Sequence, residues 1–173
     1  MMRRQPGSTH FPYTTLVRSR RKAGALASCA AESADLATGA SDEICAGFTE
    51  MGRSMGMAWQ IARDIDDLWG EHGDGMTPSN VLNKKKSLPL VHTLETAGVS
   101  TKRELGAIYM KRVLDPEDIA KMIEIQDTAG PRHTSHAKAQ ELLDHALAAL
   151  DGVSQEGKDA LASLGQWAAE GGR

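Results

Sequence analysis

The chain has 173 residues, enough for one domain or for part of a larger protein. Its formal net charge of −3 gives no general case for nucleic-acid binding, and no apolar run approaches the roughly 18 residues that cross a membrane. Aromatic residues make up only 4% of the chain, whereas Ala, Leu, Met and Glu are plentiful, which favours helix over sheet. We therefore expect an all-α protein. The two cysteines form no metal-binding or disulfide pattern, which indicates buried free thiols in a reducing compartment.

Residues 1–21 differ from the rest because they contain five arginines and no acidic residue. This composition would suit an organelle transit peptide, although it lacks the apolar core of a secretory signal. Residues 11–19 also resemble the translation of a common short-read sequencing adapter, differing from it only in having Val17 in place of Phe. We favour the adapter interpretation. It makes residues 1–19 a non-native or disordered leader, with the gene's own start upstream, and leaves one domain at residues 20–173.

Helical patterns follow one another from residue 20 onward. Residues 22–38 are rich in alanine and end near Gly39. Ser41 is then placed to cap a long helix with acidic residues in its first turn. This helix should be central, because it carries two neighbouring apolar rows. The rows are Ile44, Phe48, Met51, Met55, Trp59 and Ala62, and beside them Ala58, Ile61, Ile65 and Leu68. Three glycines in it, Gly47, Gly52 and Gly56, would let other helices approach closely.

Glycine and proline cluster between residues 70 and 79, which is typical of a loop. Helices are expected at about 101–113, from Pro116 after an Asp115 cap, at about 132–150, and from Ser154 onward. No strand pattern or repeat period appears in the sequence. Three histidines in the C-terminal part lack a zinc-ligand spacing and are expected at the surface.

Three aspartates interrupt the apolar pattern of the long helix. Asp64 and Asp67 share one helix face with Gln60, whereas Asp66 points about 100° away from Asp67. Two oxygen ligands one turn apart suit Mg²⁺, which usually takes one or two carboxylates and completes its shell with water or phosphate. The same spacing is also common on solvated surfaces, and Arg63, four residues before Asp67, could pair with it. The spacing alone leaves both interpretations open.

Residues 84–86 are three consecutive lysines ahead of an apolar helix. Such a run is usually a solvated first turn. The helix dipole, however, favours acidic residues at that end, so a separate reason for the positive charge is expected.

The order of these features resembles the C-terminal half of the polyprenyl (isoprenyl) diphosphate synthases. The order begins with Lys22 in an Ala-rich helix, followed by Gly-x-Ala-Trp-Gln-Ile, the clustered aspartates and Trp-Gly. A Gly-rich loop and Lys-Lys-Lys-Ser-Leu-Pro then follow. The resemblance covers about residues 20–97. The resemblance implies an isoprenoid-synthase-type helical bundle in which two Asp-rich motifs hold Mg²⁺ ions that clamp diphosphates. The implied function is trans-prenyltransfer, the condensation of an allylic diphosphate with isopentenyl diphosphate, in a cytoplasmic enzyme that is a homodimer when full-length.

On this resemblance, Asp64 and Asp67 correspond to metal ligands, and three other residues correspond to diphosphate-binding residues. Those three are Lys22, Gln60 and Lys86. Arg63 stands where the first Asp of the motif is expected and Asp66 is an additional acid, so both should lie beside the metal ligands.

Two further features depart from the family pattern. Asn80 takes the place of an Asp, and no Asp-Asp-x-x-Asp motif precedes residue 60. We therefore expect this chain to be inactive by itself. The alternatives are a non-catalytic or regulatory subunit of a prenyl synthase and an unrelated helical interaction domain.

Overall fold

The computed structural model describes residues 13–70 and 78–170 of the chain. Most of the residues in these two ranges are helical and neither range contains a strand, so the all-α prediction is confirmed. The elements are α1 (Tyr13–Ser19), the π-helical segment η1 (Arg20–Gly24), α2 (Ala25–Thr38), α3 (Asp42–Trp69), α4 (Ser79–Leu82), α5 (Leu88–Thr96), α6 (Val99–Met110), α7 (Pro116–Ala129), α8 (Pro131–Ala148) and α9 (Gln155–Ala169).

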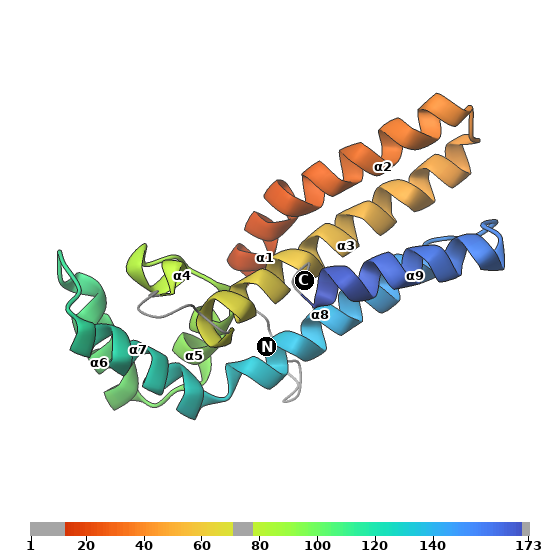
Figure 1. Ribbon diagram of the computed structural model, residues 1–173. Helices are drawn as coiled ribbons and strands as arrows, with labels where there is room; N and C mark the ends of the chain where they lie inside the picture. The colour runs from red at the N-terminus through yellow and green to blue at the C-terminus, as the bar shows by residue number, and fades with distance from the viewer. Residues whose placement is uncertain (1–12, 71–77, 171–173) are drawn as a thin grey trace, which may run out of the picture.

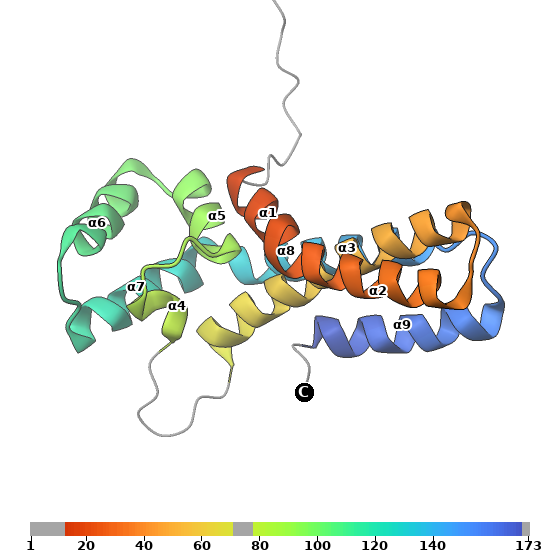
Figure 2. The ribbon, with the colours of Figure 1, turned by 90° about the horizontal axis from the view of Figure 1, so that it is seen from above.

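Helix α3 is the element around which the others are arranged, as its two apolar rows predict. Helices α2, α8 and α9 pack along α3 and form one elongated group of helices (Figure 1). Helices α4 to α7 gather near the C-terminal end of α3, on the other side of the molecule from the α2–α3 connection (Figure 2). The stretch of α3 that carries the aspartates therefore lies where these two groups meet.

Local sequence signals set several helix ends where they were predicted. Gly39 has a φ of +72° and ends α2, a conformation that costs glycine little. Ser41 caps α3, and its Oγ accepts from the amide of Ile44 at 3.5 Å. Asp115 and Asp118 form a reciprocal capping box at the start of α7. Ser154 caps α9 in the same manner as Ser41 caps α3.

Helix α6 differs from its predicted range of about 101–113. It begins at Val99 and ends at Met110, and Val113 lies beyond its end with 78% of its surface exposed. The structure gives a physical reason for the early end. Lys111 leaves the helix, and its Nζ donates to the Asp118 carboxylate at 2.7 and 2.8 Å.

The glycines of α3 allow the close packing that the sequence suggested. A Cβ atom on Gly56 would lie 2.5 Å from the carbonyl oxygen of Ala23, and one on Gly52 would lie 2.6 Å from that of Ala27. Gly47 meets the α8 end in the same way, 2.5 Å from the carbonyl oxygen of Ala149. Contacts this short leave no room for a side chain, so glycine at these positions lets the neighbouring backbones lie against α3.

Two apolar clusters flank the aspartate stretch. The first joins α3 to α8 and α9 and includes Met55, Ala58, Ile61, Ile65, Leu143 and Leu150. The second joins the end of α3 to α4 through α7 and includes Leu68, Val81, Leu90, Leu105 and Met122. The apolar row Ala58, Ile61, Ile65 and Leu68 is buried along its whole length. The aspartates are thus presented from a helix that is fixed on two sides.

The predicted leader falls partly outside the described residues, which begin at residue 13. Residues 13–19 form α1, in which Thr15 and Ser19 are buried. The boundary at residue 20 stays a prediction. Of the two cysteines, Cys29 is exposed and Cys45 is half-buried, so the expectation that both thiols are buried was wrong. Among the described helices, none combines the length and the apolar character that a membrane crossing requires.

Candidate functional site

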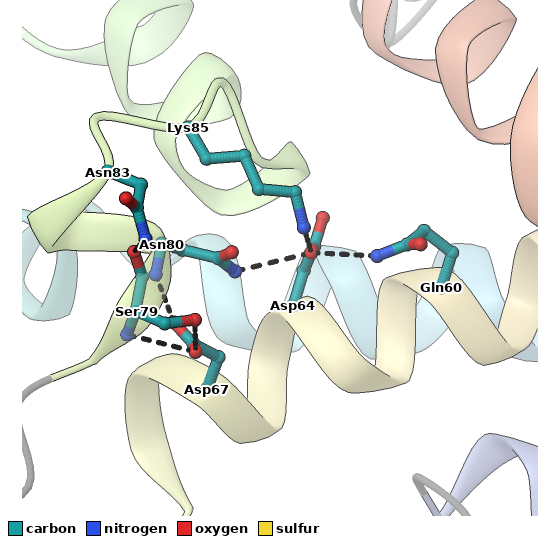
Figure 3. Close-up of polar contacts among 7 residues, drawn as sticks. All are labelled: Gln60, Asp64, Asp67, Ser79, Asn80, Asn83 and Lys85. Carbon is teal, nitrogen blue, oxygen red and sulfur yellow. Dashed lines mark hydrogen bonds and ion pairs between the residues drawn. The ribbon is translucent and has the colours of Figure 1, made fainter.

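Asp64 is the most buried of the three aspartates, with 4% of its surface exposed. Its Oδ1 accepts three hydrogen bonds, from Gln60 Nε2 at 3.0 Å, from Asn80 Nδ2 at 3.2 Å and from Lys85 Nζ at 2.8 Å (Figure 3). A buried carboxylate is costly unless it is paired and hydrogen-bonded. The three donors, from α3, α4 and the segment after α4, meet that requirement. The structure therefore places Gln60 beside Asp64, as the shared helix face predicted.

Asp67 is bound to the start of α4. Its Oδ1 accepts from the backbone amide and the hydroxyl of Ser79, at 3.0 and 2.5 Å, and its Oδ2 accepts from the backbone amide of Asn80 at 2.8 Å. These amides are among the donors that a helix start leaves unpaired, so Asp67 caps α4 from a distance in sequence. Asn80 contacts both carboxylates, as the dashed lines in Figure 3 show. Asp64 and Asp67 are thereby held by a common neighbour.

Arg63 and Asp66 form an ion pair with each other. Arg63 Nη1 lies 3.4 Å from Asp66 Oδ2, at i,i+3 spacing, and the arginine side chain is about half exposed. Arg63 could also have paired with Asp67, but the Asp67 carboxylate is taken by the residues of α4. Arg63 and Asp66 thus lie beside the Asp64 and Asp67 network, on the outside of the helix.

The three lysines have three different environments. Lys84 Nζ donates to the backbone carbonyls of Tyr109, at 3.1 Å, and of Lys111, at the end of α6. Lys85 forms the ion pair with Asp64. Lys86 is exposed and makes no hydrogen bond or ion pair with the described residues. The lysine that reaches the aspartates is therefore Lys85, which the sequence interpretation did not single out, and the expected role of Lys86 stays a prediction.

Lys22 lies in the π-helical segment η1, which packs against α3. Its side chain is exposed and contacts neither Asp64 nor Asp67 among the described residues. Single π-helical turns within helices occur frequently at functional sites. The structure therefore gives Lys22 an unusual backbone position, while its diphosphate contact stays a prediction.

A small space lies next to Asp64, lined by residues of α3, α4, α5, α6 and α7 and of the segment between α4 and α5. Its volume is about 10 Å³, near the size that holds one water molecule, and Asn80, Tyr109 and Gln126 are among the residues that line it. Gln126 is buried, and its Oε1 has no hydrogen-bond partner in the described part of the chain. Burial raises the pKa of Tyr109 to about 12, so its phenol is neutral at physiological pH. Sequence reasoning missed Tyr109 and Gln126 as neighbours of Asp64, because these residues belong to helices that are far apart in the chain.

Asp64 and Asp67 supply some, but not all, of the ligands that a divalent cation requires. Two carboxylates one helical turn apart are the number that Mg²⁺ often takes from a protein. The described residues contain no group of three or more His, Cys, Asp or Glu side chains that could hold a metal ion. A metal ion bound at Asp64 and Asp67 would therefore need its remaining ligands from water or from phosphate.

Comparisons with known proteins agree on one family. The family model for polyprenyl synthetase matches residues 9–126. The geranylgeranyl diphosphate synthase of Mycobacterium tuberculosis is 28% identical over 147 residues, which cover 83% of this chain and 42% of that protein.

The structural comparisons give the same fold. The crystal structure of a polyprenyl synthetase from Streptomyces coelicolor A3(2) matches with a TM-score of 0.79 and 26% identity, over 89% of this chain and 48% of that one. That of geranylgeranyl pyrophosphate synthetase from Pyrococcus horikoshii Ot3 matches with a TM-score of 0.76 and 23% identity, over 88% and 47%. The chain thus spans about half the length of the proteins it matches, or somewhat less. Since the family model covers well over half of its residues, the chain belongs to the polyprenyl synthetase family.

Proposed function

We propose that this chain supplies the diphosphate-holding half of a trans-prenyltransferase. In the intact protein the reaction is the condensation of an allylic diphosphate with isopentenyl diphosphate. The observation that carries the proposal is the convergence of Gln60, Asn80 and Lys85 on Asp64, next to Asp67, in a chain that belongs to the polyprenyl synthetase family. The family match sets aside the interpretation as an unrelated helical interaction domain.

The site residues have separate roles in this proposal. Asp64 and Asp67 hold Mg²⁺, which when bound neutralises the charge that develops on a leaving diphosphate. Gln60, Lys22 and Lys86 bind the diphosphate through hydrogen bonds and positive charge. The network around Asn80 orients the two carboxylates, since it bonds to both. The apolar residues on either side of the aspartates limit the access of water.

Arg63 supports a second candidate, a non-catalytic or regulatory subunit of such an enzyme. It occupies the position of an expected metal-binding Asp and is paired with Asp66. Both candidates place the full protein in the cytoplasm as a homodimer, with Mg²⁺ as its cofactor. They differ in whether the intact protein turns over its two substrates.

Calorimetric titration of the chain with inorganic pyrophosphate, with and without Mg²⁺, tests the shared part of the proposal. Pyrophosphate should bind only in the presence of Mg²⁺, and Asp64→Asn should abolish that binding. Asp159→Asn is the matched control, because Asp159 also accepts from a glutamine four residues earlier, Gln155, but is exposed on α9. Pyrophosphate binding that is independent of Mg²⁺, or that survives in Asp64→Asn, would contradict the proposal.

A product assay separates the two candidates. The chain alone should form no labelled prenyl product from allylic and isopentenyl diphosphates, because the family's mechanism uses two Asp-rich motifs and this chain carries one. The intact protein should form product if it is an enzyme and none if it is a regulatory subunit. Robust turnover by the chain as a monomer would show that one motif suffices and would refute the assignment as a half site.

A further inference from the structure

The ion pair between Lys85 and Asp64 has a consequence for metal binding. We propose that Lys85 is a tethered counter-ion of Asp64 that a divalent cation has to displace, so that metal binding releases the Lys85 ammonium group. This inference rests on the proposed function, because it concerns the same carboxylate. It adds a regulatory step that depends on one lysine.

The first argument is the imbalance of burial within the pair. The side chain of Asp64 is 5% exposed, whereas that of Lys85 is 39% exposed. A charge as buried as that of Asp64 requires a counter-ion at all times. The lysine is the partner that can leave, because its chain is long, flexible and already partly in solvent.

The second argument is electrostatic. Lys85 Nζ lies 2.8 Å from Asp64 Oδ1, so a divalent cation on the same oxygen would lie within a few ångströms of the ammonium group. Two positive charges at that separation repel each other, and they do so beside a carboxylate that is itself largely excluded from water. The other two donors to Asp64, Gln60 and Asn80, are neutral amides and carry no such conflict. The ion and Lys85 therefore exclude each other.

The third argument is the position of Lys85 in the chain. It lies in the short non-helical segment between α4 and α5, where no helix fixes its side chain. Lys84 cannot take its place, because its ammonium group is bound to the carbonyls at the end of α6. Lys86 is exposed and makes no hydrogen bond or ion pair with the described residues. Of the three lysines, Lys85 is thus the one that can exchange between Asp64 and an incoming anion.

Titration with Mn²⁺ alone, without any phosphate, tests the displacement directly. Lys85→Met keeps an unbranched side chain, one atom shorter, and removes the charge, so Mn²⁺ should bind this variant about tenfold or more tightly than the unmodified chain. Lys158→Met on α9 is the matched control, because Lys158 has no part in the proposed site, and it should bind Mn²⁺ as the unmodified chain does. Binding to Lys85→Met that is equal to, or weaker than, binding to the unmodified chain would overturn the inference while leaving the metal site in place. If neither protein bound Mn²⁺, the metal assignment itself would fail.

Lysine acylation of the unmodified chain provides a measurement that does not depend on the folding of a variant. Adding Mn²⁺ should raise the acylation rate of Lys85 several-fold, because its ammonium group is released, while the rate at Lys86 should not change. Mass spectrometry of the labelled peptides reports both rates in one sample. A Lys85 rate that stays constant as Mn²⁺ saturates the chain would overturn the inference.

Discussion

Replacing Gly56 with alanine tests how closely η1 and α2 have to approach α3. The new Cβ would lie 2.5 Å from the carbonyl oxygen of Ala23 and 2.9 Å from its carbonyl carbon, where an ordinary contact is at least 3.4 Å. Both atoms belong to the backbone, so no side chain can rotate to make room. Either η1 and α2 have to move away from α3 by about 1 Å, or the contact has to remain strained.

The expected magnitude follows from two opposing terms. Overpacking a well-packed contact costs about 1–3 kcal/mol. Replacing glycine by alanine inside a helix gains about 1 kcal/mol of helix propensity. Because the clash is with backbone, we expect the cost to lie toward its upper end and Gly56→Ala to destabilise the chain by about 1–2 kcal/mol. Gly106→Ala in α6 is the matched control, since nothing lies within 4 Å of its new Cβ, and it should stabilise the chain by up to about 1 kcal/mol.

Equilibrium unfolding in urea, followed by far-ultraviolet circular dichroism, measures both variants. The midpoint should fall for Gly56→Ala and rise for Gly106→Ala, with the dependence on urea concentration unchanged. Since Ala23 follows Lys22 directly, Gly56→Ala should also weaken Mg²⁺-dependent pyrophosphate binding, which Gly106→Ala should leave intact. If Gly56→Ala stabilised the chain as much as Gly106→Ala does, the close approach of the helices would be refuted.

Three further predictions concern charge and backbone. Arg63→Asp in the intact protein should strengthen Mg²⁺-dependent pyrophosphate binding in calorimetry, because it removes a positive charge beside the site, and unchanged or weaker binding would count against the metal assignment. Lys84 has a φ of +48° and holds the end of α6, so Lys84→Ala should destabilise the chain by about 1–2 kcal/mol, and Lys84→Gly by less, in urea unfolding. The backbone amide of Asp118 lowers the pKa of Asp115. The Asp115 carboxylate therefore stabilises the fold at pH values above 3.8, which is its pKa in the unfolded chain. This stabilisation is lost as the pH falls through the lower pKa of the folded chain. Melting temperatures measured against pH should therefore fall less steeply in acid for Asp115→Asn.

The helices were the part of the structure that the sequence predicted well, because their signals are local. Ser41 and Asp115 cap helices through atoms only three residues away. Gly39 ends a helix through its own backbone conformation. Such features depend little on the rest of the fold, so they can be recognised before any tertiary contact is known.

The partners of the aspartates could not be predicted in the same way. Helical spacing places Arg63 within reach of Asp67, but Ser79 and Asn80 of α4 bind that carboxylate, from twelve and thirteen residues further along the chain. The sequence pattern also could not predict which of the three lysines contacts Asp64. The segment that holds them is not helical, and Lys84 has a left-handed backbone conformation. The helical spacing of three or four residues does not apply in such a segment.

The charges of the aspartate stretch show why its chemistry depends on residues outside the helix. Asp66 pairs with Arg63 on the same helix, Asp67 is bound by neutral donors of α4, and Asp64 pairs with Lys85. Lys85 differs from the other partners because it is a charged residue of another segment and its side chain remains partly in solvent. An ion pair of this kind can stabilise the folded chain and still be exchanged, whereas the hydrogen bonds of Asp67 also hold the start of α4. The two carboxylates one turn apart are therefore unequal, and Asp64 is the one whose counter-ion can change without a change of fold.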